Sequence, residues 1–344
     1  MRIQLRFLAA ITICGMTATL AAEEPIVISA GLNNPTGVAI QPETGDVFVA
    51  ERTGILRFML GPDGTYKKSV EITDFPTDQY GKGPVYDIGP LGVAFVGAEY
   101  LIVGDGSQQD DKEVIRIYQL TGNPPSQPIP ASLAILTLGP LKSTDELKPE
   151  GNYYGVAFGH GSIYATANGD DTKGWIVRSV LGEDSIPGEL HRFIATKEAV
   201  ERDAPVAITI GPQGELVVGQ LGEIDVAGDS LLSIYDASSG ELKANYETGL
   251  NDITGLAYDS DGNLYATDFS WMDTNRGALY KLTVTDGECV ATKLAALDKP
   301  TALTFGEDGQ LFVTVFGTAK EGTDEFPGQL LQFSKDSLAA SANN

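Results

Sequence analysis

The stretch NDITGLAYDSDGNLYATDFS, residues 251–270, joins two short apolar segments through the polar turn DSDGN. Apolar and polar residues alternate on both sides of this turn, which is the two-residue period of β-strands. A helix–loop–helix calcium site would need Gly at the sixth loop position and a bidentate Glu at the twelfth. Counted from Asp259, these positions hold Leu264 and Ser270. The stretch therefore predicts a β-hairpin and not a calcium loop.

The same pattern of two apolar segments around a turn occurs six times along the chain. Repetition at a spacing of about fifty residues is typical of propellers and solenoids, and four strands per repeat favour a propeller. We therefore predict an all-β fold, a six-bladed β-propeller with four antiparallel strands in each blade. The six copies begin at Gly37, Gly92, Gly155, Ala207, Gly255 and Ala302.

The two ends of the chain predict how the ring closes. The last repeat has only three strands before the small and polar residues 337–344, for which we predict a disordered tail. The apolar segment PIVISAG, which begins at Pro25, is left without a blade. We expect it to supply the outer strand of blade 6 and so to cover an edge that would otherwise be exposed.

Residues 1–22 have the composition of a secretory signal peptide. Arg2 and Arg6 precede an apolar run that ends in small residues at Ala21 and Ala22, the pattern of a cleaved signal. The run is too short to predict a membrane span, and no later segment is apolar enough for one. We therefore expect a secreted or periplasmic protein whose residues 23–336 form a single propeller domain. Cys289 would then be the one cysteine left, without a partner for a disulfide.

The repeat unit P-x-G-V/L-A-x-x-x-x-x-G-x-L/V-Y/F-V-A-D/E resembles the NHL repeat and the six-bladed propellers of the gluconolactonase and senescence-marker family. LYATD, which begins at Leu264, is also similar to the YWTD repeat of receptor propellers. The resemblance covers nearly all of the chain after residue 22. It implies a cation-dependent hydrolase, in which Glu, Asn and Asp placed mostly just before the Gly of the innermost strands hold a divalent cation. In this chain, those positions are Thr36, Leu91, Tyr154, Val206, Thr254 and Thr301. The absence of a carboxylate or amide there argues against that cation site.

A second resemblance is to the soluble quinoprotein sugar dehydrogenases. VFVAERTGILRFML, from Val47, and GPLGVAF, from Gly89, are similar to two of their motifs. The catalytic His of the second motif would fall at Val96, which cannot abstract a proton. The chain has two histidines, His160 and His191, which excludes the three-His metal site of propeller lyases. It also has no G-x-S-x-G elbow and no P-loop.

Acidic loops are expected to gather on one face of the disc. The formal net charge is −24, and in a propeller the loops after the second strands and between blades surround the channel mouth. Such a face would attract cations, basic peptides or polyamines and repel nucleic acid. A ligand pocket also needs aromatic walls and a few polar anchors; Tyr153 beside Tyr154 is a further aromatic candidate. The candidate ligand-binding residues are Asp105, Tyr154, Asp170, Asp268, Trp271 and Arg276.

One Asn or Asp precedes the innermost strand of each blade. Asn and Asp commonly bond to neighbouring backbone in turns, so their recurrence has a structural explanation beside a ligand-binding one. Three of them, Asn34, Asn152 and Asp252, are the candidate metal ligands.

These observations predict a binding or scaffold module and not an enzyme. The expected partner is an unidentified protein, peptide or small molecule, with cationic ligands favoured, and neither nucleic acid nor a membrane. We expect a monomer and predict no cofactor, with calcium as the alternative. The alternative function is a cation-dependent lactonase-like hydrolase or a quinoprotein-like sugar oxidoreductase with diverged catalytic residues.

Overall fold

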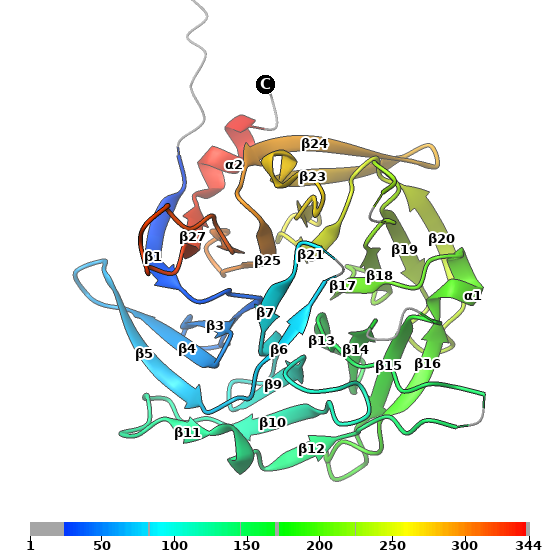
Figure 1. Ribbon diagram of the computed structural model, residues 1–344, viewed down its shortest axis with the longest axis horizontal. Helices are drawn as coiled ribbons and strands as arrows, with labels where there is room; N and C mark the ends of the chain where they lie inside the picture. The colour runs from blue at the N-terminus through cyan, green and yellow to red at the C-terminus, as the bar shows by residue number, and fades with distance from the viewer. Residues whose placement is uncertain (1–23, 82, 145, 169–171, 224, 342–344) are drawn as a thin grey trace, which may run out of the picture.

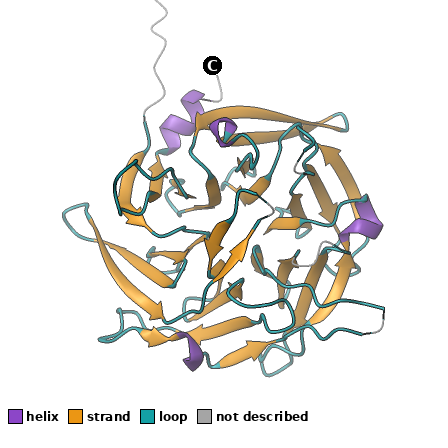
Figure 2. Ribbon diagram, in the orientation of Figure 1, coloured by secondary structure: helices purple, strands orange, loops and turns teal. Residues whose placement is uncertain are grey.

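The computed structural model describes residues 24–81, 83–144, 146–168, 172–223 and 225–341, and shows six β-sheets arranged around a central axis (Figures 1 and 2). Each sheet is a blade, and the predicted six-bladed propeller is confirmed. Within a blade the strands pair with their neighbours in antiparallel fashion, from the innermost strand outward. The outer strand of blade 1 also carries a short parallel addition, β11 (Ile129–Pro130).

Blades 1 to 3 consist of β2 (Gly37–Ile40), β3 (Val47–Glu51), β4 (Gly54–Leu60) and β5 (Tyr66–Thr73); β8 (Pro90–Val96), β9 (Tyr100–Asp105), β10 (Ile115–Gln119) and β12 (Leu136–Leu138); and β13 (Val156–Gly159), β14 (Ser162–Ala167), β15 (Trp175–Val180) and β16 (His191–Ala195). Blades 4 to 6 consist of β17 (Pro205–Ile210), β18 (Leu216–Gln220), β19 (Leu231–Tyr235) and β20 (Leu242–Glu247); β21 (Ile253–Tyr258), β22 (Leu264–Asp268), β23 (Ala278–Thr285) and β24 (Glu288–Ala296); and β25 (Pro300–Phe305), β26 (Leu311–Val315), β27 (Gly328–Phe333) and β1 (Ile26–Leu32).

The N-terminal strand closes the ring, as predicted. Strand β1 pairs with β27 in antiparallel register, with Ile26 opposite Gln332 and Leu32 opposite Gly328. The first and last strands therefore lie in one blade (Figure 1). This pairing covers the outer edge of β27, which would otherwise present unpaired backbone groups.

The glycines that open the innermost strands are required by the packing of neighbouring blades. A Cβ on Gly37 would lie 2.3 Å from Leu91 O, and one on Gly92 would lie 2.2 Å from the carbonyl oxygen of Tyr154. The next blade passes too close for a side chain, so Gly is needed for this approach of two backbones.

Threonines just before the Gly or Ala that begins three of the repeats connect one blade to the next. The Oγ1 atoms of Thr36 and Thr254 donate to the carbonyl oxygens of Pro90 (2.8 Å) and Pro300 (2.9 Å). Thr301 Oγ1 donates to Pro35 O at 2.6 Å, across the seam where the ring closes. Positions that the resemblance assigns to metal ligands therefore hold the blades together in this chain.

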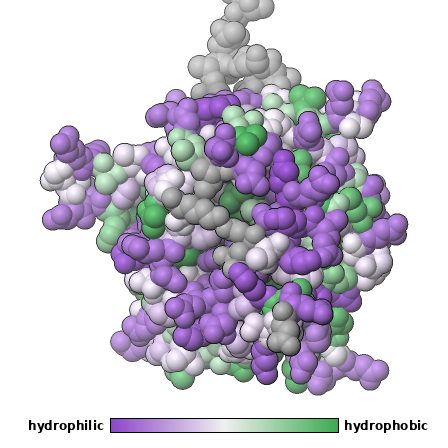
Figure 3. Space-filling model, turned by 45° about the vertical axis from the view of Figure 1, so that its right-hand side comes forward, coloured by the Kyte–Doolittle hydropathy of each residue, from purple (hydrophilic) through white to green (hydrophobic). Residues whose placement is uncertain are grey.

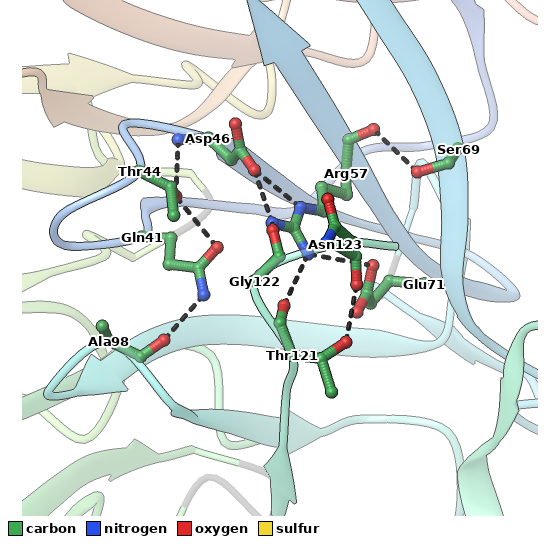
Figure 4. A network of polar contacts seen from close by, with 10 residues as sticks. All are labelled: Gln41, Thr44, Asp46, Arg57, Ser69, Glu71, Ala98, Thr121, Gly122 and Asn123. Carbon is green, nitrogen blue, oxygen red and sulfur yellow. Dashed lines mark hydrogen bonds and ion pairs between the residues drawn. The ribbon is translucent and has the colours of Figure 1, made fainter. Parts of the chain in front are cut away.

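Apolar side chains fill the seams between blades, and a buried ionic network lies at the seam of blades 1 and 2 (Figure 4). Arg57, which is fully buried, donates from Nε to Asp46 (2.7 Å) and also to the backbone oxygens of Thr121 and Gly122. Its guanidinium lies 3.8 Å from Glu71. Burial raises the pKa of Glu71 to about 7, against the opposing effect of Arg57. Arg57 therefore links two blades through groups of both.

The structure corrects the prediction of a disordered tail from residue 337. Helix α2 (Lys335–Ser341) follows β27, and Leu338 is buried in the cluster that contains Leu297 and Phe333. Ser334 begins the helix by accepting a bond from the backbone N–H of Ser337 at 3.1 Å. The burial of Leu338 and this cap stabilise a helix in a segment whose composition is polar. The predicted signal peptide, residues 1–22, lies outside the described residues.

Among the described helices, none has both the length and the apolar character that a membrane crossing requires.

Candidate functional site

A hairpin that the sequence analysis did not predict lies across the mouth of the channel (Figure 1). It consists of β6 (Asp78–Tyr80) and β7 (Tyr86–Ile88) in the connection between blades 1 and 2. The Tyr86 ring lies within 5.1–5.5 Å of the rings of Trp271, Phe316 and Phe269, from blades 5 and 6. These contacts attach the hairpin to blades 5 and 6.

A polar cleft of about 720 Å³ opens beside this hairpin. The hairpin and Trp271 form one wall, and the loops of blades 2 and 4 form the others. Trp271 is fixed by its Nε1, which donates to Pro84 O at 3.1 Å, and by edge-to-face contact with Tyr80 at 5.7 Å. Residues from four blades therefore meet in one concavity, with an aromatic wall and a polar floor.

Asp252 lies at the floor of this cleft with 6% of its surface exposed. Its Oδ2 accepts a bond from the backbone N–H of Trp271 at 2.6 Å. Burial raises the pKa of Asp252 to about 6; the bond from Trp271 opposes the shift, and the charges of Asp268 and Asp229 add to it. A carboxyl group with a raised pKa at the base of a cleft is a candidate general base.

Asn152, which precedes blade 3, lines the same cleft. Its φ is 50°, and its backbone N–H donates to Glu113, a fully buried residue of blade 2. Burial raises the pKa of Glu113 to about 9, with Asp105 and Asp110 adding to the shift and the Asn152 bond opposing it. Glu113, which does not itself line the cleft, therefore positions the backbone of Asn152.

Of the other predicted ligand residues, Trp271 lines the cleft, and Tyr154 and Arg276 lie close to it. Tyr154 lies in the channel beneath the hairpin, where its hydroxyl donates to Thr301 O at 2.9 Å. Burial raises the pKa of this hydroxyl. Arg276 lines an adjoining pocket of about 260 Å³ that shares Asp225 and Asp252 with the cleft.

Asp105 and Asp268, two of the predicted ligand residues, do not line the cleft. Asp105 is fully buried and pairs with Arg116 at 2.6 Å. Asp268 accepts backbone N–H groups of Asn251, Asp252 and Ser270 at 2.8–3.1 Å. The carboxylates that end the second strands thus hold loops in place.

The remaining candidates lie elsewhere. Tyr153 is fully buried within a core cluster. Asn34 donates to Asp87 O at 2.9 Å and is not among the residues that line the cleft. Asp170 lies outside the described residues.

The residues present do not fit the cation site that the resemblance implies. Within the part of the chain that the structure describes, no group of three or more His, Cys, Asp or Glu side chains is arranged to hold a metal ion. Asn152 and Asp252 share the cleft, but the third candidate, Asn34, is apart from it.

The residues do not fit the quinoprotein site either. Val96 packs against a core cluster, and both histidines, His160 and His191, are exposed and lie outside the cleft lining. We therefore derive no step through a metal ion or a quinone.

A sequence signal for the hairpin was present in the long connection between blades 1 and 2, where Tyr80 and Tyr86 flank the Gly- and Pro-containing segment GKGP. Such a segment between aromatic residues is compatible with a hairpin turn. What the sequence could not supply is the partner of the hairpin, because Trp271 and Phe316 are far away along the chain.

The sequence matches no protein-family model and no curated protein. Its fold resembles many solved structures. The soluble aldose sugar dehydrogenase of Escherichia coli has a TM-score of 0.57 and 15% identity, over 90% of this chain and 98% of that one. A gluconolactonase of Xanthomonas campestris has a TM-score of 0.55 and 13% identity, over 92% of each chain. A luciferin-regenerating enzyme has a TM-score of 0.60 and 13% identity, over 90% of this chain and 95% of that one.

At these identities the likeness concerns the fold. This chain is a six-bladed β-propeller, with the architecture also found in gluconolactonase-like proteins and sugar dehydrogenases.

Proposed function

We propose that this protein hydrolyses sugar-derived lactones in the cleft beside the hairpin, with Asp252 as the general base. The structural neighbours named as gluconolactonases support this alternative over the binding module that the sequence analysis preferred. The cleft itself also supports it, because a concave site with an aromatic wall and a few polar groups is suited to a small polar molecule. Trp271 and Tyr80 provide the wall, and Asn152 and Asp252 lie at its base.

The single observation that carries the proposal is the environment of Asp252. With a pKa of about 6, the carboxyl group is largely ionised at neutral pH and is still basic enough to accept a proton. Its N–H is fixed by Asp268 and its Oδ2 by Trp271. Asp252 is therefore held in one orientation, as a general base has to be.

The proposed step needs water and no other co-reactant. Asp252 removes a proton from a water molecule, whose oxygen bonds to the lactone carbonyl carbon. The tetrahedral intermediate then collapses, the bond from that carbon to the ring oxygen breaks, and the ring oxygen takes the proton from Asp252. The products are the open hydroxy acid and an aspartate ready for another turnover.

The test is hydrolysis of gluconolactone, followed by acid release in a pH-stat and corrected for the spontaneous reaction. We expect Asp252→Asn to lower kcat by about 100-fold or more. The wild-type rate should rise with pH through an apparent pKa near 6, because the ionised carboxylate is the active form.

The matched control is Asp261→Asn in the exposed turn between β21 and β22, at the opposite end of blade 5. This variant should retain the wild-type rate. An Asp252→Asn variant that folds and hydrolyses the lactone at the wild-type rate would falsify the proposal.

A second function, binding of a cationic ligand without turnover, is favoured by the excess of carboxylates along the cleft. It predicts that spermidine binds in a calorimetric titration with an affinity that falls as salt is added. Absence of spermidine binding at low salt would remove this candidate.

A further inference from the structure

We propose that the cleft accepts uncharged lactones and rejects lactones that carry a phosphate or carboxylate group, and that the same charge expels the acidic product. This inference rests on the proposed function and specifies its substrate class. It is carried by the side chains that line the cleft and by the way in which its two basic groups are already paired.

The lining of the cleft has a strong excess of negative charge. Two basic side chains, Lys197 and Arg202, contribute to the lining together with six carboxylates. For the described lining residues, the formal balance is therefore four negative charges within one concavity. The carboxylates are those of Asp78, Asp110, Asp203, Glu223, Asp225 and Asp252.

The two basic side chains are already engaged by carboxylates. Lys197 Nζ lies 2.5 Å from Asp203, and Arg202 Nη2 lies 3.4 Å from Asp229. An incoming phosphate would have to compete with these carboxylates, which are fixed in place and close by. Among the described residues that line it, the cleft thus has no uncommitted cationic anchor of the kind that sites for phosphorylated sugars use.

The negative groups come from several sides of the cleft. Asp78 belongs to the hairpin, Asp110 to the loop after β9, Glu223 and Asp225 to the loop after β18, and Asp252 to the floor. Hydrophilic side chains also cover most of the surface seen in Figure 3. An anion anywhere in the cleft is therefore near like charges, and a concave low-dielectric wall strengthens that repulsion.

Lactone hydrolysis changes the charge of the bound molecule. An uncharged lactone enters as a neutral molecule and leaves as a hydroxy acid, which is ionised at neutral pH because carboxylic acids have pKa values of about 4. The same lining accepts the uncharged substrate and repels the product, which carries one negative charge. We expect the product to be a poor inhibitor for this reason.

The experiment compares gluconolactone with phosphogluconolactone, which differ by one phosphate. At low ionic strength we expect kcat/KM to favour the uncharged lactone by about tenfold or more, with the difference shrinking at high salt. Gluconate should inhibit weakly at low salt. Equal or better use of the phosphorylated lactone at low salt would overturn the inference.

Neutralising part of the lining should relax the selectivity. In the double variant Glu223→Gln, Asp225→Asn, kcat/KM for phosphogluconolactone should rise several-fold relative to that for gluconolactone. The control is the double variant Glu43→Gln, Asp308→Asn. It removes two exposed charges from the turns between the first and second strands of blades 1 and 6, at the end of each blade that faces away from the cleft. A shift of the same size in the control would show a net-charge effect and would overturn the assignment to the cleft.

A binding measurement separates this inference from the proposed function. If neither lactone is hydrolysed, the hydrolase proposal fails, and calorimetric titrations with glucose and with phosphogluconate still test the charge selection. Tighter binding of glucose supports the inference. Equal affinity, including no measurable binding of either molecule, overturns it.

Discussion

At the scale of single residues, two aspartates at the same end of the β21–β22 hairpin have different roles. The carboxylate of Asp268, at the end of β22, accepts hydrogen bonds from three backbone N–H groups. Asp252, just before β21, lies instead at the floor of the cleft. The sequence marked both as candidates because both are acidic residues at loop positions. It could not separate them, because the difference depends on which backbone groups fold back onto each carboxylate.

Glu113 gives a prediction about stability and pH. The pKa of this buried carboxyl group is raised from an ordinary value of 4.5 to about 9. Between these values the unfolded chain releases a proton that the folded chain keeps, so the contribution of Glu113 to stability is lost as pH rises. Glu113→Gln cannot ionise and keeps an oxygen to accept the Asn152 N–H. From about pH 5 to about pH 8, the stability of this variant relative to wild type should improve by at least about 1.4 kcal/mol, the equivalent of one pKa unit.

Urea denaturation at the two pH values measures this difference. The exposed Glu99→Gln variant controls for the loss of one negative charge. A difference between Glu113→Gln and wild type that is the same at both pH values would contradict the explanation.

At the scale of elements, the hairpin of β6 and β7 is the part of the site that depends on tertiary contacts. Tyr86 touches three aromatic rings of blades 5 and 6, and it lines the channel beneath the hairpin but not the cleft. We expect Tyr86→Ala to lower stability by about 1–3 kcal/mol. Because the hairpin forms a wall of the cleft, KM for gluconolactone should also rise several-fold while kcat changes less.

The control for this variant is Tyr100→Ala, which removes an exposed tyrosine of β9. It should leave KM unchanged and cost less stability. If Tyr86→Ala changes stability alone, the hairpin supports the fold without forming a wall of the binding site.

The strands of the blades could be predicted from the sequence, whereas the hairpin could not. The six repeats show their period within short segments, and glycines such as Gly92 occur where adjacent backbones meet. The pattern of strands could therefore be found without knowing any distant contact. The cleft could be predicted only in part, as Asn152, Asp252 and Trp271, because its lining comes from the hairpin and from several blades.

At the scale of the whole molecule, the ring is closed by the pairing of β1 with β27 and by the bond from Thr301 to Pro35. The sequence predicted this closure because the last repeat lacks one strand and the first segment is a spare one. Closure leaves each of the six blades with at least four strands, and no blade lacks its outer strand. The blade that closes the ring therefore depends on a strand from the opposite end of the chain.

Deleting residues 24–32 tests this dependence. The deletion removes β1, including the fully buried Leu32, and uncovers the edge of β27. An exposed edge of a strand that also carries the buried Leu330 and Leu331 is a template for pairing with another chain. We expect the shortened protein to have a lower Tm and to self-associate in sedimentation velocity experiments. A synthetic peptide of residues 24–32, added in trans, should bind to the open edge, raise the Tm and reduce self-association. A shortened protein that stays monomeric with an unchanged Tm would show that the remaining blades hold the ring without its last strand.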